Sequence, residues 1–140
     1  MKSDTGNYRW RMVALLFFAT TINYIDRGVL GILAPDLQVK LKWSESDYGY
    51  IVMVFQAAYA IGLITTGGIL DRIGTRLGYT LAMIVWSIAG IFHSVGRSPL
   101  SFGIARFALG LGQSANFPAA VKTVSEWFPK RERALATGIF

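Results

Sequence analysis

Long apolar blocks alternate with short polar segments along the 140 residues of the chain. Each block comes close to the roughly 20 residues that an α-helix needs to cross a bilayer, at about 1.5 Å of rise per residue. The pattern predicts helical spans at residues 11–34, 48–70, 78–96 and 100–121, and the start of a fifth helix before Phe140. We therefore expect an all-α fold, a polytopic bundle of membrane helices.

The polar links between the blocks carry signals for helix boundaries. Ser44 precedes Asp47 by three residues, which is the spacing of a capping box at the start of the second helix. Only residues 71–76 separate the second block from the third, so these two helices should run antiparallel. Pro118 cannot donate a backbone hydrogen bond to the carbonyl of Ser114, and it should kink the fourth helix there.

The composition supports a membrane protein. Hydrophobic residues make up 53% of the chain and charged residues only 16%, against roughly 25% charged residues in an average soluble domain. The net charge of +6 comes from short basic clusters between the apolar blocks, so no nucleic-acid partner is expected. The chain lacks cysteine, and its single histidine, His93, has no second metal ligand at a suitable spacing, so a structural role is expected for it. No nucleophile and base stand out as a pair, so we expect no metal site, no cofactor and no enzyme.

The basic residues divide unevenly between the two ends of the predicted spans. One end has nine of them: Lys2, Arg9, Arg11, Arg72, Arg76, Lys122, Lys130, Arg131 and Arg133. The other end has Lys40, Lys42 and Arg97. Because basic residues concentrate on the cytoplasmic side of membrane proteins, the N-terminus is expected to be cytoplasmic.

Three charged residues fall well inside the predicted spans, away from their ends: Asp26, Arg27 and Arg106. A charge at the centre of a lipid-facing helix costs about 2.5–3.5 kcal/mol, so such residues normally face a partner or a hydrated cavity. Asp26 lies about 13 Å below Pro35, and Arg106 lies about 10 Å below Pro99, at 1.5 Å per residue. At such similar depths we expect the two to pair, which leaves Arg27 free to bind an anion. Asp26 is suited to a proton relay, and an ion pair that only fixes helix packing is the alternative.

The segment GGILDRIGTR, at residues 67–76, resembles the loop between the second and third helices of the major facilitator superfamily. The positions that match the family pattern are Gly67, Asp71, Arg72, Gly74 and Arg76. Thr75 departs from it, because a basic residue is commoner there. In that family the loop engages neighbouring helix ends as a conformational latch, and the resemblance implies this role for Asp71, Arg72 and Gly74. Without the resemblance, the segment is a turn between two helices with a glycine for positive φ.

Two further segments narrow the resemblance. NYIDRGVLGILAP, at residues 23–35, and the sequence from Ala105 to Phe140 resemble the anion:cation symporter branch of that superfamily, and most closely its bacterial hexuronate transporters. The resemblance implies a multi-pass protein of the bacterial inner membrane that takes up a sugar acid, such as glucuronate or galacturonate, with protons rather than sodium ions. It implies that Asp26 is the protonation site. The residues that it assigns to substrate binding are Tyr24, Arg27, Tyr59 and Arg106.

Gln113 departs from the family pattern, which usually has a glutamate seven residues after this arginine. Seven residues make two helical turns, so Gln113 should share the face of Arg106, about 10 Å deeper, and belong to the substrate site. Glutamine can donate and accept hydrogen bonds but cannot release a proton. The sequence therefore leaves three alternatives for transport. The protein could couple to protons through Asp26 alone, exchange substrates, or carry another organic anion.

A complete carrier of this type has twelve spans in two halves, with the substrate between them. The resemblance therefore implies that residues 1–140 are the N-terminal part of a carrier. Its partners would be the lipid bilayer, a small sugar-acid anion and the missing C-terminal half. A function of another class is a membrane scaffold or assembly protein, whose buried charges would specify helix pairing. Ligand binding by the longer gene product distinguishes these two classes.

Overall fold

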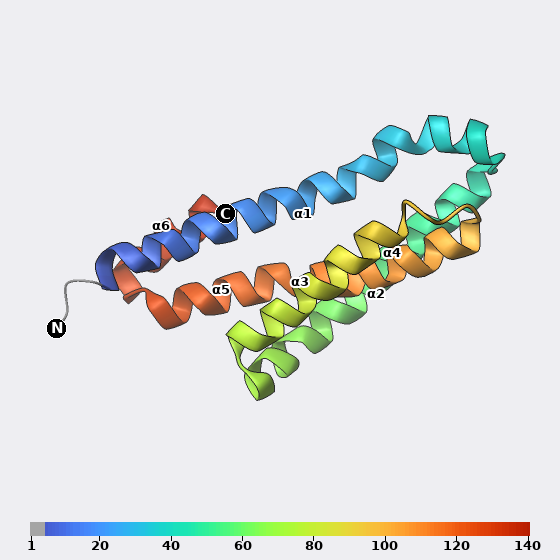
Figure 1. Cartoon of the computed structure of the whole chain (residues 1–140). Coiled ribbons are helices and arrows are strands. Elements are labelled where there is room, and N and C mark those ends of the chain that lie inside the picture. The colour runs from blue at the N-terminus through green and yellow to red at the C-terminus, as the bar shows by residue number, and fades with distance from the viewer. Residues whose placement is uncertain (1–4) are drawn as a thin grey trace.

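The computed structural model describes residues 5–140, and Figure 1 shows them as an elongated array of helices. The helices are α1 (Thr5–Leu41), α2 (Glu45–Ile73), α3 (Thr75–Phe92), α4 (Pro99–Ser114), α5 (Asn116–Trp127) and α6 (Lys130–Ile139). No strand occurs in the described residues, and the expected all-α fold is confirmed. Lys2, one of the basic residues counted above, lies outside the described residues.

Three helices are long and apolar enough to cross a membrane, at Tyr8–Leu41, Glu45–Ile73 and Thr75–Phe92. The expected fourth span, 100–121, is broken at Ala115, between α4 and α5. The break lies where the sequence predicts a kink, because the nitrogen of Pro118 cannot donate to the carbonyl of Ser114. Neither α4, with 16 residues, nor α5, with 12, is long enough to cross a bilayer alone.

The first helix is longer than the sequence predicts. α1 continues through Pro35 to Leu41, so the expectation that this helix ends near Pro35 is wrong. A proline inside a helix removes one backbone hydrogen bond and bends the helix without always ending it. Figure 1 shows α1 bending in its cyan C-terminal part.

Local sequence sets the boundaries of α2. Ser44 and Asp47 form the expected capping box, in which Ser44 Oγ accepts from the Asp47 amide at 3.1 Å and Asp47 Oδ2 accepts from the Ser44 amide at 2.9 Å. At the other end, Gly74 alone separates α2 from α3, with a φ of +85° that favours glycine. The predicted antiparallel pairing of these helices is confirmed (Figure 1).

Glycines allow the helices to pack closely. The most extensive interface joins α2 to α4, where a Cβ on Gly110 would lie 2.7 Å from the carbonyl oxygen of Phe55. Gly112 lies as close to α3, because its Cβ would be 2.9 Å from the backbone nitrogen of Trp86. Close backbone contact at small residues is how membrane helices associate when apolar burial supplies little driving force.

The bundle is apolar on the outside, and a few polar residues lie within its largely apolar interior. Ile32, Val39 and Ile64 are each more than three-quarters exposed, as side chains that face acyl chains are. Asn23 and Gln113, in contrast, are almost fully buried. Polar residues inside a membrane bundle hydrogen-bond across helices.

Gly110→Ala should destabilise the bundle, because the new Cβ would clash with the backbone of α2. Overpacking of this kind costs about 1–3 kcal/mol. We expect a lower unfolding temperature for the purified full-length protein in detergent. Gly67→Ala is the matched control, since a Cβ on Gly67 would have no neighbour within 4 Å. Equal unfolding temperatures for the two variants would contradict the close contact of α2 with α4.

Candidate functional site

The charged residues predicted within the spans lie in the middle of the bundle, near the break between α4 and α5. α1 contributes Asn23 and Arg27, which the i, i+4 spacing places on one helix face. α4 contributes Arg106 and Gln113, with 5% and 0% of their surface exposed. The sequence predicts a shared level for Asp26 and Arg106, with Gln113 about 10 Å deeper. The structure brings α1 and α4 together at Arg27 and Gln113.

Arg27 has neutral partners. Its Nε donates a hydrogen bond to Gln113 Oε1 at 3.3 Å. The guanidinium carbon lies 4.1 Å from the ring centroid of Tyr59 and 5.4 Å from that of Tyr24. Cation–π contacts stabilise a cation without neutralising it. Within the described residues no carboxylate lies within ion-pairing distance of Arg27, so its positive charge is unbalanced.

Arg106 is also without an acidic partner in the part of the chain that the structure describes. Its guanidinium carbon lies 5.6 Å from the ring centroid of Phe55 on α2. Its Nε is buried and has no hydrogen-bond partner among residues 5–140. A buried donor without a partner costs about 1–3 kcal/mol, so this nitrogen is available to an acceptor that enters the site.

The predicted ion pair between Asp26 and Arg106 is wrong. Asp26 Oδ2 accepts a hydrogen bond of 2.6 Å from Nε1 of Trp86 on α3, whereas the Arg106 guanidinium lies against α2. Similar depth in the membrane did not decide the direction of the two side chains. The ion pairs found among the described residues join Arg9 to Glu132 and Lys122 to Asp71, outside the site.

Trp86 is the residue that sequence reasoning missed. It is only 5% exposed, and its neighbours in the apolar cluster are Phe55, Ala89 and Leu109. A buried tryptophan usually directs its N–H to an acceptor, and Trp86 lies within a predicted span, away from the interfaces where membrane tryptophans gather. Those two signals could have directed the search for an acceptor to Asp26.

Gln113 joins two helices through both its backbone and its side chain. Its carbonyl accepts a hydrogen bond of 3.4 Å from Asn23 Nδ2, while Oε1 accepts from Arg27. Its Nε2 is buried and has no partner among the described residues. Gln113 therefore holds the Arg27 guanidinium and retains a donor for a hydroxyl group.

A second polar cluster lies beside the site and connects three helices. Tyr79 on α3 donates to Asn116 Oδ1 at 2.6 Å, and Asn116 Nδ2 donates to Thr20 Oγ1 on α1 at 3.0 Å. These bonds satisfy the amide of Asn116, so it holds the start of α5 in place.

The predicted latch residues lie at the far end of α2. Lys122 on α5 forms an ion pair with Asp71, and Thr75 Oγ1 donates to Glu126 Oε1 at 2.7 Å. Arg72 is exposed, and Gly74 makes the turn. The α2–α3 turn is thus held against α5, and its role as a latch stays a prediction.

Comparisons with known proteins agree with this architecture. Residues 16–140 match the model of a family described as the Major Facilitator Superfamily. The chain is 36% identical over 132 residues to a galacturonate transporter of Dickeya chrysanthemi, covering 94% of this chain and 38% of that protein. It is 35% identical to a hexuronate transporter of Escherichia coli K12, covering 94% and 31% of the two chains. A probable galactarate/D-glucarate transporter of Bacillus subtilis is 34% identical, with 94% and 30% covered. The chain therefore spans about a third of the length of these relatives.

Trp86→Phe should destabilise the protein, because it removes the N–H that bonds to Asp26. A hydrogen bond to a charged group contributes about 1.5–3 kcal/mol. In a double-mutant cycle with Asp26→Ala, we expect a coupling of at least about 0.5 kcal/mol in the unfolding free energy of the full-length protein.

Trp43→Phe is the matched control for this cycle. Trp43 is equally buried, but its Nε1 has no partner among the described residues. Its substitution should show no coupling to Asp26→Ala. Additive effects of Trp86→Phe and Asp26→Ala would mean that the hydrogen bond contributes nothing to stability.

Proposed function

Since the chain belongs to the Major Facilitator Superfamily, we propose that it is the N-terminal part of a secondary transporter that takes up a hexuronate together with protons. The galacturonate and hexuronate transporters among its relatives support a sugar acid, such as glucuronate or galacturonate, as the cargo. The chain spans about a third of those relatives, and the proposal assigns the activity to a longer protein that includes a C-terminal half. Proteins of this family are transporters and not enzymes.

The observation that carries the proposal is the excess of positive charge in the interior. Two guanidinium groups, on Arg27 and Arg106, share the middle of the bundle with one carboxylate, on Asp26. One positive charge is therefore unbalanced, and a hexuronate carries one carboxylate. Arginine binds carboxylates through parallel N–H groups, which gives both strength and orientation.

The neighbours of Arg27 suit the rest of a sugar acid. The rings of Tyr24 and Tyr59 lie beside the guanidinium, and both carry a hydroxyl group. The Gln113 amide retains one unused N–H donor among the described residues. A binding site of this type combines apolar walls with a few polar groups that fix the orientation of the ligand.

The membrane potential gives a physical reason for the proposed coupling of protons to the anion. Moving one negative charge inward against a negative-inside potential costs about 2.3 kcal/mol per 100 mV. One proton per hexuronate cancels that charge, and Asp26 is the carboxylate available to carry it. Asp26 can accept the Trp86 hydrogen bond both as a carboxylate and as a carboxylic acid, because each form retains an acceptor oxygen.

The proposed location is a bacterial inner membrane with the N-terminus in the cytoplasm. Arg9, Arg72, Arg76 and Lys122 belong to the more basic end of the bundle, and the positive-inside rule places that end in the cytoplasm. The end where α1 joins α2 then faces outward. In this orientation the Asp71–Lys122 ion pair holds the cytoplasmic turn, as the proposed latch requires.

Arg27→Ala should abolish uptake of galacturonate and glucuronate by the full-length transporter. Loss of a charge-assisted pair with a carboxylate costs about 2–5 kcal/mol, so affinity should fall at least roughly thirtyfold. Isothermal titration on the purified protein measures this. Arg97→Ala, an exposed arginine outside the helices, is the control and should retain affinity. Correct membrane assembly without any affinity of the wild type for sugar acids would favour the scaffold function.

Gln113→Glu should make substrate binding depend on pH. An ionised glutamate at this position would pair with Arg27 Nε, now 3.3 Å from Gln113 Oε1, and would compete with the substrate carboxylate. We expect affinity to fall at least about tenfold at alkaline pH and to recover on acidification. Gln38→Glu, near the end of α1, should show no such dependence. Affinity of the Gln113 variant that does not change with pH would argue against Arg27 as the anion site.

A further inference from the structure

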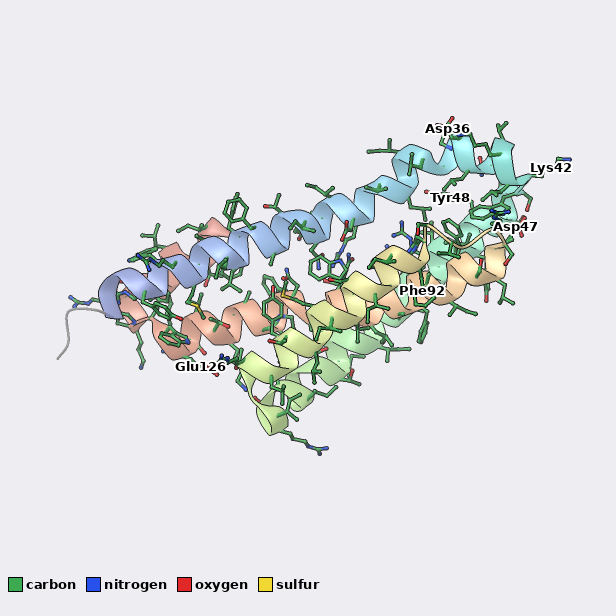
Figure 2. The ribbon with its side chains drawn as sticks, viewed as in Figure 1. Asp36, Lys42, Asp47, Tyr48, Phe92 and Glu126 are labelled. Atoms are coloured by element: carbon green, nitrogen blue, oxygen red, sulfur yellow. The ribbon has the colours of Figure 1, made fainter. Side chains whose placement is uncertain are left out.

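A cavity of about 300 Å³ lies between α1, α4 and the C-terminal end of α3. The ionisable side chains that line it are Asp26, His93 and Arg106. Figure 2 shows Phe92, the residue before His93, in the half of the bundle that carries Tyr48, away from Glu126. In the proposed orientation this is the outward half, and His93 lies between Asp26 and that surface.

The hydrogen bond at Nδ1 fixes the tautomer of neutral His93. Nδ1 lies 2.7 Å from the carbonyl oxygen of Ala89, one turn earlier on the same helix. A carbonyl oxygen can only accept, so Nδ1 must carry the hydrogen and donate it. The neutral imidazole therefore has its lone pair on Nε2, which makes Nε2 the proton-accepting atom.

The Nε2 atom of His93 has no group that donates a hydrogen bond to it in the described part of the chain. It is buried and has no hydrogen-bond partner among residues 5–140. The ring packs at right angles to Phe102, with centroids 5.4 Å apart, so the imidazole is held in one orientation. A buried acceptor left unsatisfied is unfavourable. A proton at Nε2 turns this atom into a donor, but burial disfavours the added charge unless a carboxylate offsets it. The carboxylate that lines the same cavity is Asp26.

We infer that His93 is the outward proton acceptor of the transporter and passes protons to Asp26. This inference rests on the proposed proton-coupled uptake and adds the entry route for the proton. The groups that face the imidazole across the cavity are Asp26 from α1, which attracts its protonated form, and Arg106 from α4, which repels it. Gln113 cannot bind and release a proton, so it cannot serve as a second protonation site beside Asp26. His93 supplies that second titratable group.

Each step of the relay conserves protons and charge. A proton that enters the cavity from the outward side binds the Nε2 lone pair and gives an imidazolium with N–H on both nitrogens. That Nε2–H then dissociates, and the proton binds a carboxylate oxygen of Asp26. The imidazole returns to its neutral form with Nδ1–H still bonded to Ala89. The proton on Asp26 neutralises the carboxylate and leaves the guanidinium groups of Arg27 and Arg106 without a negative charge to offset them, so binding of the sugar acid follows.

The test is uptake by the full-length transporter with His93→Gln, reconstituted in liposomes. Glutamine fills the place of the imidazole with an amide that cannot bind a proton at neutral pH. We expect uptake driven by a pH gradient to fall about tenfold or more, because a positioned proton acceptor typically contributes at least that much. Counterflow of labelled galacturonate, which needs no net proton movement, should stay within a factor of two. The decline of uptake with rising pH should also flatten, because the substitution removes a titrating imidazole.

Two comparisons make the outcome decisive. Ser94 lines the same cavity, and its hydroxyl donates a hydrogen bond to the Ile91 carbonyl. The Ser94→Ala variant should therefore behave like the wild type. Asp26→Asn should lose gradient-driven uptake as His93→Gln does. Gradient-driven uptake and a pH profile of His93→Gln equal to the wild type would overturn the relay. Parallel loss of counterflow and uptake would also overturn it, by showing a structural role. Wild-type liposomes that take up no sugar acid at all would instead refute the proposed function.

Discussion

Arg27 carries a full charge into the apolar middle of the bundle, and the helices around it are arranged to hold that charge without cancelling it. Arg27 is partly buried, and a charge taken out of water requires polar contacts. The amide of Gln113 and the ring of Tyr59 provide them, and both are neutral. An acidic partner at the same place would stabilise Arg27 and remove its attraction for an anion. Because its partners are neutral, Arg27 is stabilised in the interior and still keeps a positive charge that can attract the proposed substrate.

The adjacent acid and base of α1 serve different neighbours. Successive residues of an α-helix point about 100° apart, so Asp26 and Arg27 cannot share one partner. Asp26 contacts Trp86 on α3, and Arg27 contacts Gln113 on α4. The acid thus lines the cavity that also holds His93, while the base lies against Tyr59, which is not part of that lining. Separate surroundings of this kind allow proton binding and anion binding to occur at neighbouring groups.

The features that the sequence predicted correctly are mostly local. The capping box at Ser44, the turn at Gly74 and the helix break caused by Pro118 each depend on residues within one turn of the chain. The apolar blocks follow from bilayer thickness and predict which segments form helices. Pro35 shows the limit of such signals, because tertiary packing and the neighbouring residues decide whether a proline bends a helix or ends it.

By itself the sequence determined the membrane class, the helices, and the identity of the charged residues that share the interior, because hydropathy and helical rise depend on composition and distance along the chain. Only the tertiary structure decided that Asp26 bonds to Trp86 and not to Arg106. It also placed His93 in the cavity of Asp26. These choices depend on how each helix is rotated about its axis. That rotation is set by close contacts such as Gly110 against α2, between residues far apart in the chain.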